Sequence, residues 1–300
     1  MKKKTYLFAL MAMALTLGSC SDNENGIGGE TSKYITVSTS IGNMTRVATD
    51  AKGGQTFEEG DEISVYAWTG APTVAPETSE RVVNNAINKL TNGSWVSTPQ
   101  MLWKNNRDKH YFIGVYPVSA ISDLSAGEYT FDETKQVESD LLVAVNKDGI
   151  SYNADEQQTV PLTFTHVMAK LAVNLTYKNQ WGGIPTVEKV VVGNAAKEAT
   201  INYLTKVVTP SATAKEDFSL PEITENTKYV SVIIPQEEVK QLTIVIGGKN
   251  FVYDNGTPFK LESGKITTVN LEVGRDEIKL GDVKITNWED GSTFSGEALN

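Results

Sequence analysis

Tyr34-Ile35-Thr36-Val37-Ser38-Thr39-Ser40-Ile41 is the stretch that decides the fold, because apolar and polar side chains alternate along it. Successive side chains of a β-strand point to opposite faces, so Ile35, Val37 and Ile41 share one face and the two serines share the other. Strand-like runs recur at Glu62–Trp68, His110–Tyr116, Leu141–Val145, Leu162–Thr176, Val187–Val192, Lys228–Ile234, Leu242–Ile246, Asn250–Tyr253, Ile266–Val273 and Glu277–Trp288. No segment keeps a helical period over three turns, so the sequence predicts a mainly β protein.

Turn signals and length indicate how these strands are organised. Asn92-Gly93 and Gly247-Gly248 each lie between two strand-like runs, which predicts short hairpins. The 300 residues are more than one compact core usually needs, and the polar segment Ser151–Thr159 lies near the middle. We therefore expect two Greek-key β-sandwich domains in tandem, over residues 33–157 and 158–300. The segment Arg81–Leu90 is an alternative helix, since its apolar residues suit one helical face.

The N-terminus has the pattern of an export signal. Three lysines precede the apolar run Tyr6–Leu17, which is too short to span a bilayer. The run ends at Leu17-Gly18-Ser19-Cys20, which resembles the lipobox of bacterial lipoproteins, where the cysteine is acylated. We expect residues 1–19 to be a signal peptide, Cys20 to be lipidated, and residues 20–32 to form a flexible tether to the outer membrane. The acidic residues of this tether resemble the surface-export signals of some Gram-negative lipoproteins.

Composition and motifs exclude most kinds of nucleic-acid-binding, metal-binding and catalytic site. Lys and Arg number 27 against 37 Asp and Glu, which excludes the concentrated positive charge that nucleic acid requires. One Cys and two His exclude multi-Cys and most multi-His metal sites, and the sequence has no phosphate loop, nucleophile elbow or calcium loop. The apolar neighbours of His166 predict that it is a core or edge histidine, whereas the charged residues before His110 predict that it lies at a solvated hairpin end. We expect no enzymatic activity, no metal and no cofactor.

Short motifs follow one another in a characteristic order along the chain. They are Phe57-Glu58-Glu59-Gly60-Asp61-Glu62-Ile63-Ser64-Val65-Tyr66, Asn92-Gly93-Ser94-Trp95, Tyr111–Pro117, Asp140–Ala144, Leu162–Leu171 and Ile285–Gly291. In this order and behind a lipobox they resemble the fimbrillin family, whose members are subunits of type V pili; the first fits the family pattern F-x-x-GD-x-I-x-V. The resemblance implies two transthyretin-like β-sandwich domains, export as an Mfa-like lipoprotein, and assembly with other fimbrial subunits at the outer membrane.

The resemblance also implies a mechanism of assembly. In such subunits an arginine-specific protease removes the first strand, and a strand from the next subunit fills the vacated groove. Here the removable strand carries Ile35, Val37 and Ile41, and we expect cleavage between Arg46 and Val47 in the polar loop that follows it. The other arginines lie within or beside strand-like or helix-like runs, where a protease has poor access: Arg81, Arg107 and Arg275.

The donor strand would come from the other end of the chain. The segment Glu277–Trp288 has apolar residues suited to enter the groove, which are Ile278, Leu280, Val283 and Ile285. Their alternation shifts by one residue at Gly281-Asp282, which predicts a bulge or a bend between two short strands. The sequence leaves open whether this segment pairs within its own domain or with a neighbouring subunit, where head-to-tail contacts would build an open filament.

A second class of function shares several of these features. A surface glycan-binding lipoprotein of a polysaccharide-uptake system would also have the lipobox, the acidic tether and the β-sandwiches, and the five tryptophans could supply a sugar-stacking platform. Tryptophans spread so widely along a chain are more typical of cores. The fimbrial interpretation itself leaves room for a host glycan or protein as a ligand.

Overall fold

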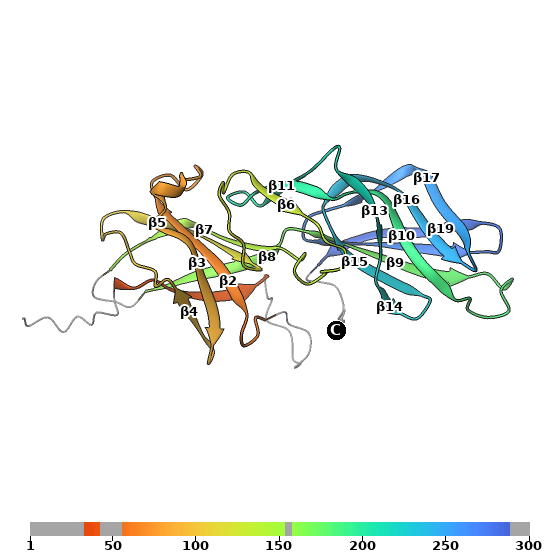
Figure 1. Ribbon diagram of the computed structural model, residues 1–300, viewed down its shortest axis with the longest axis horizontal. Helices are drawn as coiled ribbons and strands as arrows, with labels where there is room; N and C mark the ends of the chain where they lie inside the picture. Colours follow the sequence, from red (N-terminus) through yellow and green to blue (C-terminus); the bar gives the residue numbers. More distant parts are fainter. Residues whose placement is uncertain (1–32, 43–55, 154–157, 289–300) are drawn as a thin grey trace, which may run out of the picture.

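The structure is a computed structural model that describes residues 33–42, 56–153 and 158–288. Cys20, Arg46 and Val47 lie outside the described residues. Nearly all of the regular structure is β-strand, and the molecule is elongated, with the early strands at one end and the late strands at the other (Figure 1). The predicted mainly β fold is therefore confirmed.

The first sheet has seven strands in the order β1-β8-β7-β5-β2-β3-β4. Its strands are β1 (Thr36–Ile41), β2 (Glu62–Thr69), β3 (Val83–Thr91), β4 (Ser94–Thr98), β5 (Lys109–Tyr116), β7 (Leu142–Ser151) and β8 (Thr159–His166), with a 3-10 turn, η2 (Thr78–Glu80), before β3. The edge strand β1 pairs with β8 in parallel, whereas the other neighbours in this sheet are antiparallel. The two edges of the sheet are thus β1 and β4.

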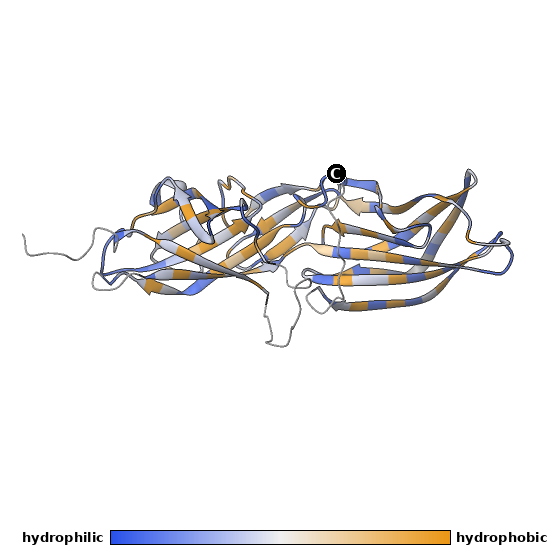
Figure 2. Cartoon of the chain, turned by 90° about the horizontal axis from the view of Figure 1, so that it is seen from below, coloured by the Kyte–Doolittle hydropathy of each residue, from blue (hydrophilic) through white to orange (hydrophobic). Residues whose placement is uncertain are grey.

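The central strands β2 and β5 of the first sheet are buried on both faces. Val65 and Phe112 belong to a core within the N-terminal half, on the same face as the apolar residues of β1. Their chain neighbours Tyr66 and Ile113 point the other way and belong to a larger core that continues among the later strands. Burial on both faces explains why these strands read as nearly continuous apolar runs. Figure 2 shows hydrophobic residues, in orange, along strands at both ends of the molecule.

The later strands form three further sheets. One sheet contains β13 (Lys215–Ser219), β10 (Val187–Ala196), β16 (Gln236–Ile246) and β17 (Lys249–Leu261) in that order. The next contains β14 (Glu222–Thr224), β15 (Lys228–Ile233), β9 (Ala169–Tyr177), β18 (Lys265–Val273) and β19 (Ile278–Asn287). The smallest contains β12 (Val207–Pro210), β11 (Glu198–Asn202) and β6 (Gly127–Thr130). The strand β6 therefore leaves the early part of the chain and pairs with a late strand.

The chain crosses from the first sheet to the five-stranded sheet between His166 and Ala169, because β8 belongs to the first sheet and β9 to the other. The pairing of β6 with β11 and the shared larger core join the two halves of the molecule. The division into domains over residues 33–157 and 158–300 stays a prediction.

Both predicted hairpins are present. Asn92 and Gly93 connect β3 to β4 with φ angles of 51° and 73°, and Gly247 and Gly248 connect β16 to β17 with φ angles of 59° and 71°. Two successive positive φ angles match the right-handed twist of the flanking strands, which is why Asn-Gly and Gly-Gly mark such turns.

The alternative helix over Arg81–Leu90 is wrong, because this segment contains the strand β3. Val83 pairs with Ala67, and Ala86 pairs with Val65, so two residues of β3 oppose one residue of β2 between these pairs. This β-bulge, at which Asn85 has a φ of 56°, brings Val83 and Ala86 to the same buried face. The three-residue spacing that resembled a helix is the spacing of a bulged strand.

Candidate functional site: the first and last strands

The first strand fills part of the N-terminal core. The side chains of Ile35 and Val37 are only 2% and 6% exposed, and that of Ile41 is partly buried. Along β8, the register runs from Thr36 opposite Thr159 to Ile41 opposite Phe164. Since β1 is an edge strand, Val37 and Ile41 are attached to the sheet through one neighbour in the ladder, β8.

Backbone hydrogen bonds hold both ends of this segment. The Ile35 amide donates to the Met101 carbonyl at 3.0 Å, and the Trp103 amide donates to the Lys33 carbonyl at 3.2 Å. At the other end, the Gly42 amide donates to the Phe164 carbonyl at 2.8 Å. The residues from Tyr34 to Ile41 thus form one extended segment along the edge of the first sheet.

A groove of about 740 Å³ lies between β1 and the β3–β4 hairpin. Side chains of β1, Phe57, Leu90 and Trp95 line it. The Trp95 indole Nε1 donates a 3.0 Å hydrogen bond to Thr39 Oγ1, so the two edges of the sheet approach each other. The Phe57 ring packs against the rings of Trp95 and Phe164 with centroid distances of 5.3 and 5.1 Å. Aromatic side chains therefore close one part of the space beside β1.

The exposure of the arginines differs from the prediction in part. Arg81 is buried, and its guanidinium donates hydrogen bonds to the carbonyls of Ile121 and Ser122, at 2.7 and 2.5 Å. Arg107, between β4 and β5, and Arg275, between β18 and β19, are exposed in bends outside the strands. Of these three arginines, only Arg81 is therefore protected from a protease by burial.

The last strand, β19, pairs antiparallel with β18 at the edge of the five-stranded sheet. Of the two arrangements that the sequence left open, the structure has this segment within its own chain. The register shifts at Gly281, since Leu280 pairs with Leu271 whereas Asp282 pairs with Asn270. The shift at Gly281-Asp282 is therefore a β-bulge in one continuous strand.

This bulge brings four apolar side chains to one face of β19. Directly paired residues of an antiparallel ladder share a face, and the four partners on β18 are all buried. The pairs are Ile278 with Val273, Leu280 with Leu271, Val283 with Val269, and Ile285 with Thr267. Burial is uneven along this face, because Ile278 and Leu280 pack against the core whereas Val283 and Ile285 are each 38% exposed.

The sequence profile of the fimbrillin-like family matches residues 45–288 of this chain. The chain belongs to the fimbrillin-like family. No curated protein matches its sequence. Family membership supports a fimbrial structural subunit at the cell surface.

Solved structures resemble this fimbrillin-like protein in fold. A protein from Bacteroides ovatus, proposed to act in cell adhesion, is 17% identical with a TM-score of 0.64, over 85% of this chain and 98% of its own. One from Bacteroides uniformis, proposed to have the same role, is 18% identical with a TM-score of 0.61, over 78% and 93%. A fimbrial protein from Bacteroides vulgatus is 13% identical with a TM-score of 0.50, over 84% and 99%. At such identities the likeness concerns the β-sandwich fold.

The two histidines of the fimbrillin-like protein are both buried. His166 is 5% exposed, as predicted, and its Nδ1 lies 2.8 Å from Asp140 Oδ1, a carboxylate partner that sequence reasoning missed. The prediction for His110 is wrong, because its side chain is fully buried on β5 between β2 and β7. Its Nε2 accepts a 3.0 Å hydrogen bond from the Lys104 amide, and burial lowers the pKa of His110. Neither histidine lines the groove beside β1.

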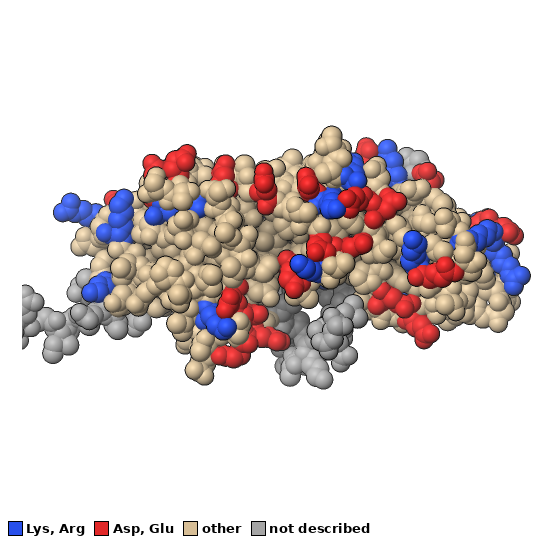
Figure 3. Space-filling view, in the orientation of Figure 1, with Lys and Arg blue, Asp and Glu red and all other residues tan. Residues whose placement is uncertain are grey.

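The five tryptophans of the fimbrillin-like protein are all buried or partly buried. Trp68 lies on β2 and Trp95 on β4, whereas the other three lie outside the strands. All five pack against core side chains, so they form no platform of exposed indoles for stacking sugars. Within residues 33–42, 56–153 and 158–288, no group of three or more His, Cys, Asp or Glu side chains could hold a metal ion. On the face shown in Figure 3, basic side chains are scattered among acidic ones. The described part of the chain has no helix of the length and apolar character needed to cross a bilayer.

Proposed function

We propose that this protein is a structural subunit of a type V fimbria, exported as a lipoprotein through Cys20 and assembled by donor-strand exchange. One observation carries the proposal: β1 is an edge strand paired with β8, and the short segment that contains it places Ile35, just before β1, and Val37 in a core. Cleavage after Arg46, in the segment between β1 and β2, would separate this strand from the rest of the chain.

Removal of β1 would leave a free strand edge and empty apolar pockets, which together favour the binding of another strand. The free edge of β8 would present unpaired backbone N–H and C=O groups, which readily pair with an extended chain. The pockets of Ile35 and Val37 would open to water, and refilling them would recover about 1.5 to 3 kcal/mol for each fully buried side chain. The groove beside β1 would then join the vacated space.

We propose β19 as the donor. Its four apolar side chains share one face, with Ile278 and Leu280 two residues apart and Val283 and Ile285 two residues apart, which is also the spacing of Ile35 and Val37. A one-residue slip would turn these side chains away from the pockets, so alternation fixes the register of insertion. As an edge strand, β19 can leave its sheet without separating two other strands.

We predict that an arginine-specific protease converts the monomeric protein into oligomers. Because Arg107 and Arg275 are also exposed, the substrate carries Arg107→Lys and Arg275→Lys, which such an enzyme does not cut. N-terminal sequencing should then read Val47-Ala48-Thr49-Asp50, and size-exclusion chromatography with light scattering should show a ladder of oligomers. The same protein with Arg46→Ala should remain monomeric. Cleaved protein that stays monomeric would contradict the stalk role and favour a cap, a tip or a glycan-binding lipoprotein.

We predict that Cys20→Ala abolishes the lipid anchor. The lipobox supplies the one cysteine of the chain, so no other thiol can accept the diacylglyceryl group. Metabolic labelling with a palmitate analogue should mark the wild type and leave the variant unlabelled, and the variant should appear in the soluble fraction. A label retained by the variant would show that the lipobox interpretation is wrong.

A further inference from the structure

The chain is anchored immediately after β19 by Trp288. The indole of Trp288 is only 5% exposed, and its ring stacks on the His166 ring with a centroid distance of 4.1 Å and an interplanar angle of 6°. The Trp288 amide also donates a 3.0 Å hydrogen bond to the Gly264 carbonyl in the turn before β18. The Lys170 ammonium lies 4.1 Å from the indole centroid, a cation–π contact from β9. Residues of β8, β9 and the turn before β18 therefore contact Trp288.

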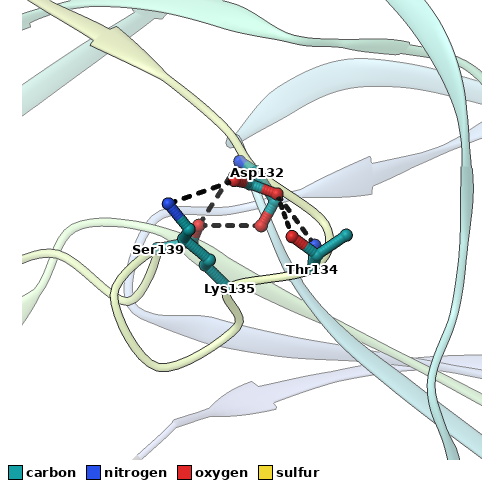
Figure 4. Close-up of polar contacts among 4 residues, drawn as sticks. All are labelled: Asp132, Thr134, Lys135 and Ser139. Atoms are coloured by element: carbon teal, nitrogen blue, oxygen red, sulfur yellow. Dashed lines mark hydrogen bonds and ion pairs between the residues drawn. The ribbon is translucent and has the colours of Figure 1, made fainter.

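The residues that contact the Trp288 indole, His166 and Lys170, form its seat, and His166 is itself held in place by hydrogen bonding. His166 is the last residue of β8, and the Asp140 carboxylate fixes its ring through the 2.8 Å contact at Nδ1. The loop before Asp140 is closed by Ser139, whose hydroxyl donates to the Asp132 carbonyl at 3.1 Å (Figure 4). Hydrogen bonds from Thr134 hold the Asp132 side chain in this loop and lower the pKa of its carboxyl (Figure 4). The aromatic seat is thus pre-organised by buried and hydrogen-bonded groups.

The apolar side chains in the C-terminal half of β19 are less buried than Trp288. Val283 and Ile285, the apolar residues nearest to Trp288, are each 38% exposed, and the ladder is interrupted at Gly281. At the far end, the Glu277 carboxylate pairs with the Lys178 ammonium on the surface. Exposed ion pairs contribute little to stability, whereas a buried aromatic side chain is among the largest apolar contributions that one residue can make. Trp288 is therefore the strongest single attachment at the C-terminal end of β19.

We infer that Trp288, seated on His166 and Lys170, is a latch that keeps β19 in its own sheet and must leave its seat before β19 can be donated. This inference rests on the proposed donor-strand function and concerns its regulation. His166 is the last residue of β8, the strand that pairs with β1, so β8 contacts both the first strand and the residue that follows β19. The ease with which Trp288 leaves its seat therefore determines how readily a subunit can donate β19.

The test is amide hydrogen–deuterium exchange on the uncleaved full chain, which reports release of β19 without any polymerisation. Trp288→Ala should speed exchange in residues 278–287 by at least about tenfold, the change expected for each 1.4 kcal/mol of lost anchoring. Exchange in β9 and β15 should stay as in the wild type. Trp288→Phe, which keeps an aromatic ring over His166, should show a smaller increase, and Trp288→Leu supplies a bulkier variant should the alanine protein fail to fold.

Trp181→Ala is the matched control. Trp181 is a partly buried tryptophan whose Nε1 donates to the Val273 carbonyl at 3.0 Å, at the opposite end of the β18–β19 pair. Its loss should leave exchange in residues 283–287 unchanged. Unaltered exchange of β19 in the Trp288 variants, or equal acceleration throughout the five-stranded sheet, would overturn the latch. Since exchange is measured before cleavage, either result is independent of whether the cleaved protein polymerises.

Discussion

A subunit that carries Val283→Asp and Ile285→Asp should fold like the wild type, be cleaved like the wild type, and fail to polymerise. In the subunit's own sheet both side chains are 38% exposed, so carboxylates at these positions can reach water. Surface substitutions of this kind usually change stability by about 0.5 kcal/mol. In the proposed groove the same positions would enter apolar pockets, where an unpaired carboxylate is strongly unfavourable. The variant separates the stability of the monomer from its ability to donate a strand.

The control places the same substitution on the opposite face of β19. Lys279 and Lys284 are exposed, and they alternate with the apolar residues, so Lys279→Asp with Lys284→Asp adds more negative charge while leaving the apolar face intact. This control should still polymerise after cleavage, as judged by size-exclusion chromatography with light scattering. Polymerisation of the Val283 and Ile285 variant would mean that another segment is the donor.

A mixture of two variants, one unable to donate a strand and one unable to accept a strand, tests the same prediction more directly. After cleavage, the Val283→Asp and Ile285→Asp protein should accept a strand but be unable to donate one. The Arg46→Ala protein, with its first strand in place, should donate but be unable to accept. An equimolar mixture should therefore give a heterodimer and nothing larger, which light scattering can resolve. This outcome would assign the groove and the donor to separate ends of the chain.

The strands could be predicted from the sequence because each buried face leaves a period of two in the residues that form it. The alternation in β1 and the turn signals at Asn92-Gly93 and Gly247-Gly248 are local features, and the structure contains each of them. The bulge in β3 was invisible because an added residue changes the period to three, which a helix also produces. The phase shift at Gly281 could be recognised because apolar alternation continues on both sides of it.

The contacts around His166 and His110 depend on distant parts of the chain. Asp140 precedes β7 and meets His166 because β7 and β8 pair, a register that no local pattern states. His110 follows charged residues, which predicted an exposed turn, yet β2 and β7 flank it on both sides and bury it. The parallel pairing of β1 with β8 is likewise a property of topology. Candidate strands could thus be predicted, whereas their partners and the latch residue Trp288 required the three-dimensional arrangement.

Ile35→Ala should strongly destabilise the uncleaved protein and leave the assembled fimbria unaffected. Ile35 is 2% exposed, and replacing a buried isoleucine by alanine costs about 2 to 5 kcal/mol. If β1 is removed during maturation, the substituted residue leaves with it, and the donor strand supplies the side chains of the assembled state. Ile63→Ala is the matched control, because Ile63 is fully buried on β2 in the same core and stays in the mature subunit. Thermal unfolding should show a lower melting temperature for both variants before cleavage and for Ile63→Ala alone in the polymers, whereas an equal loss in Ile35→Ala polymers would show that β1 is retained.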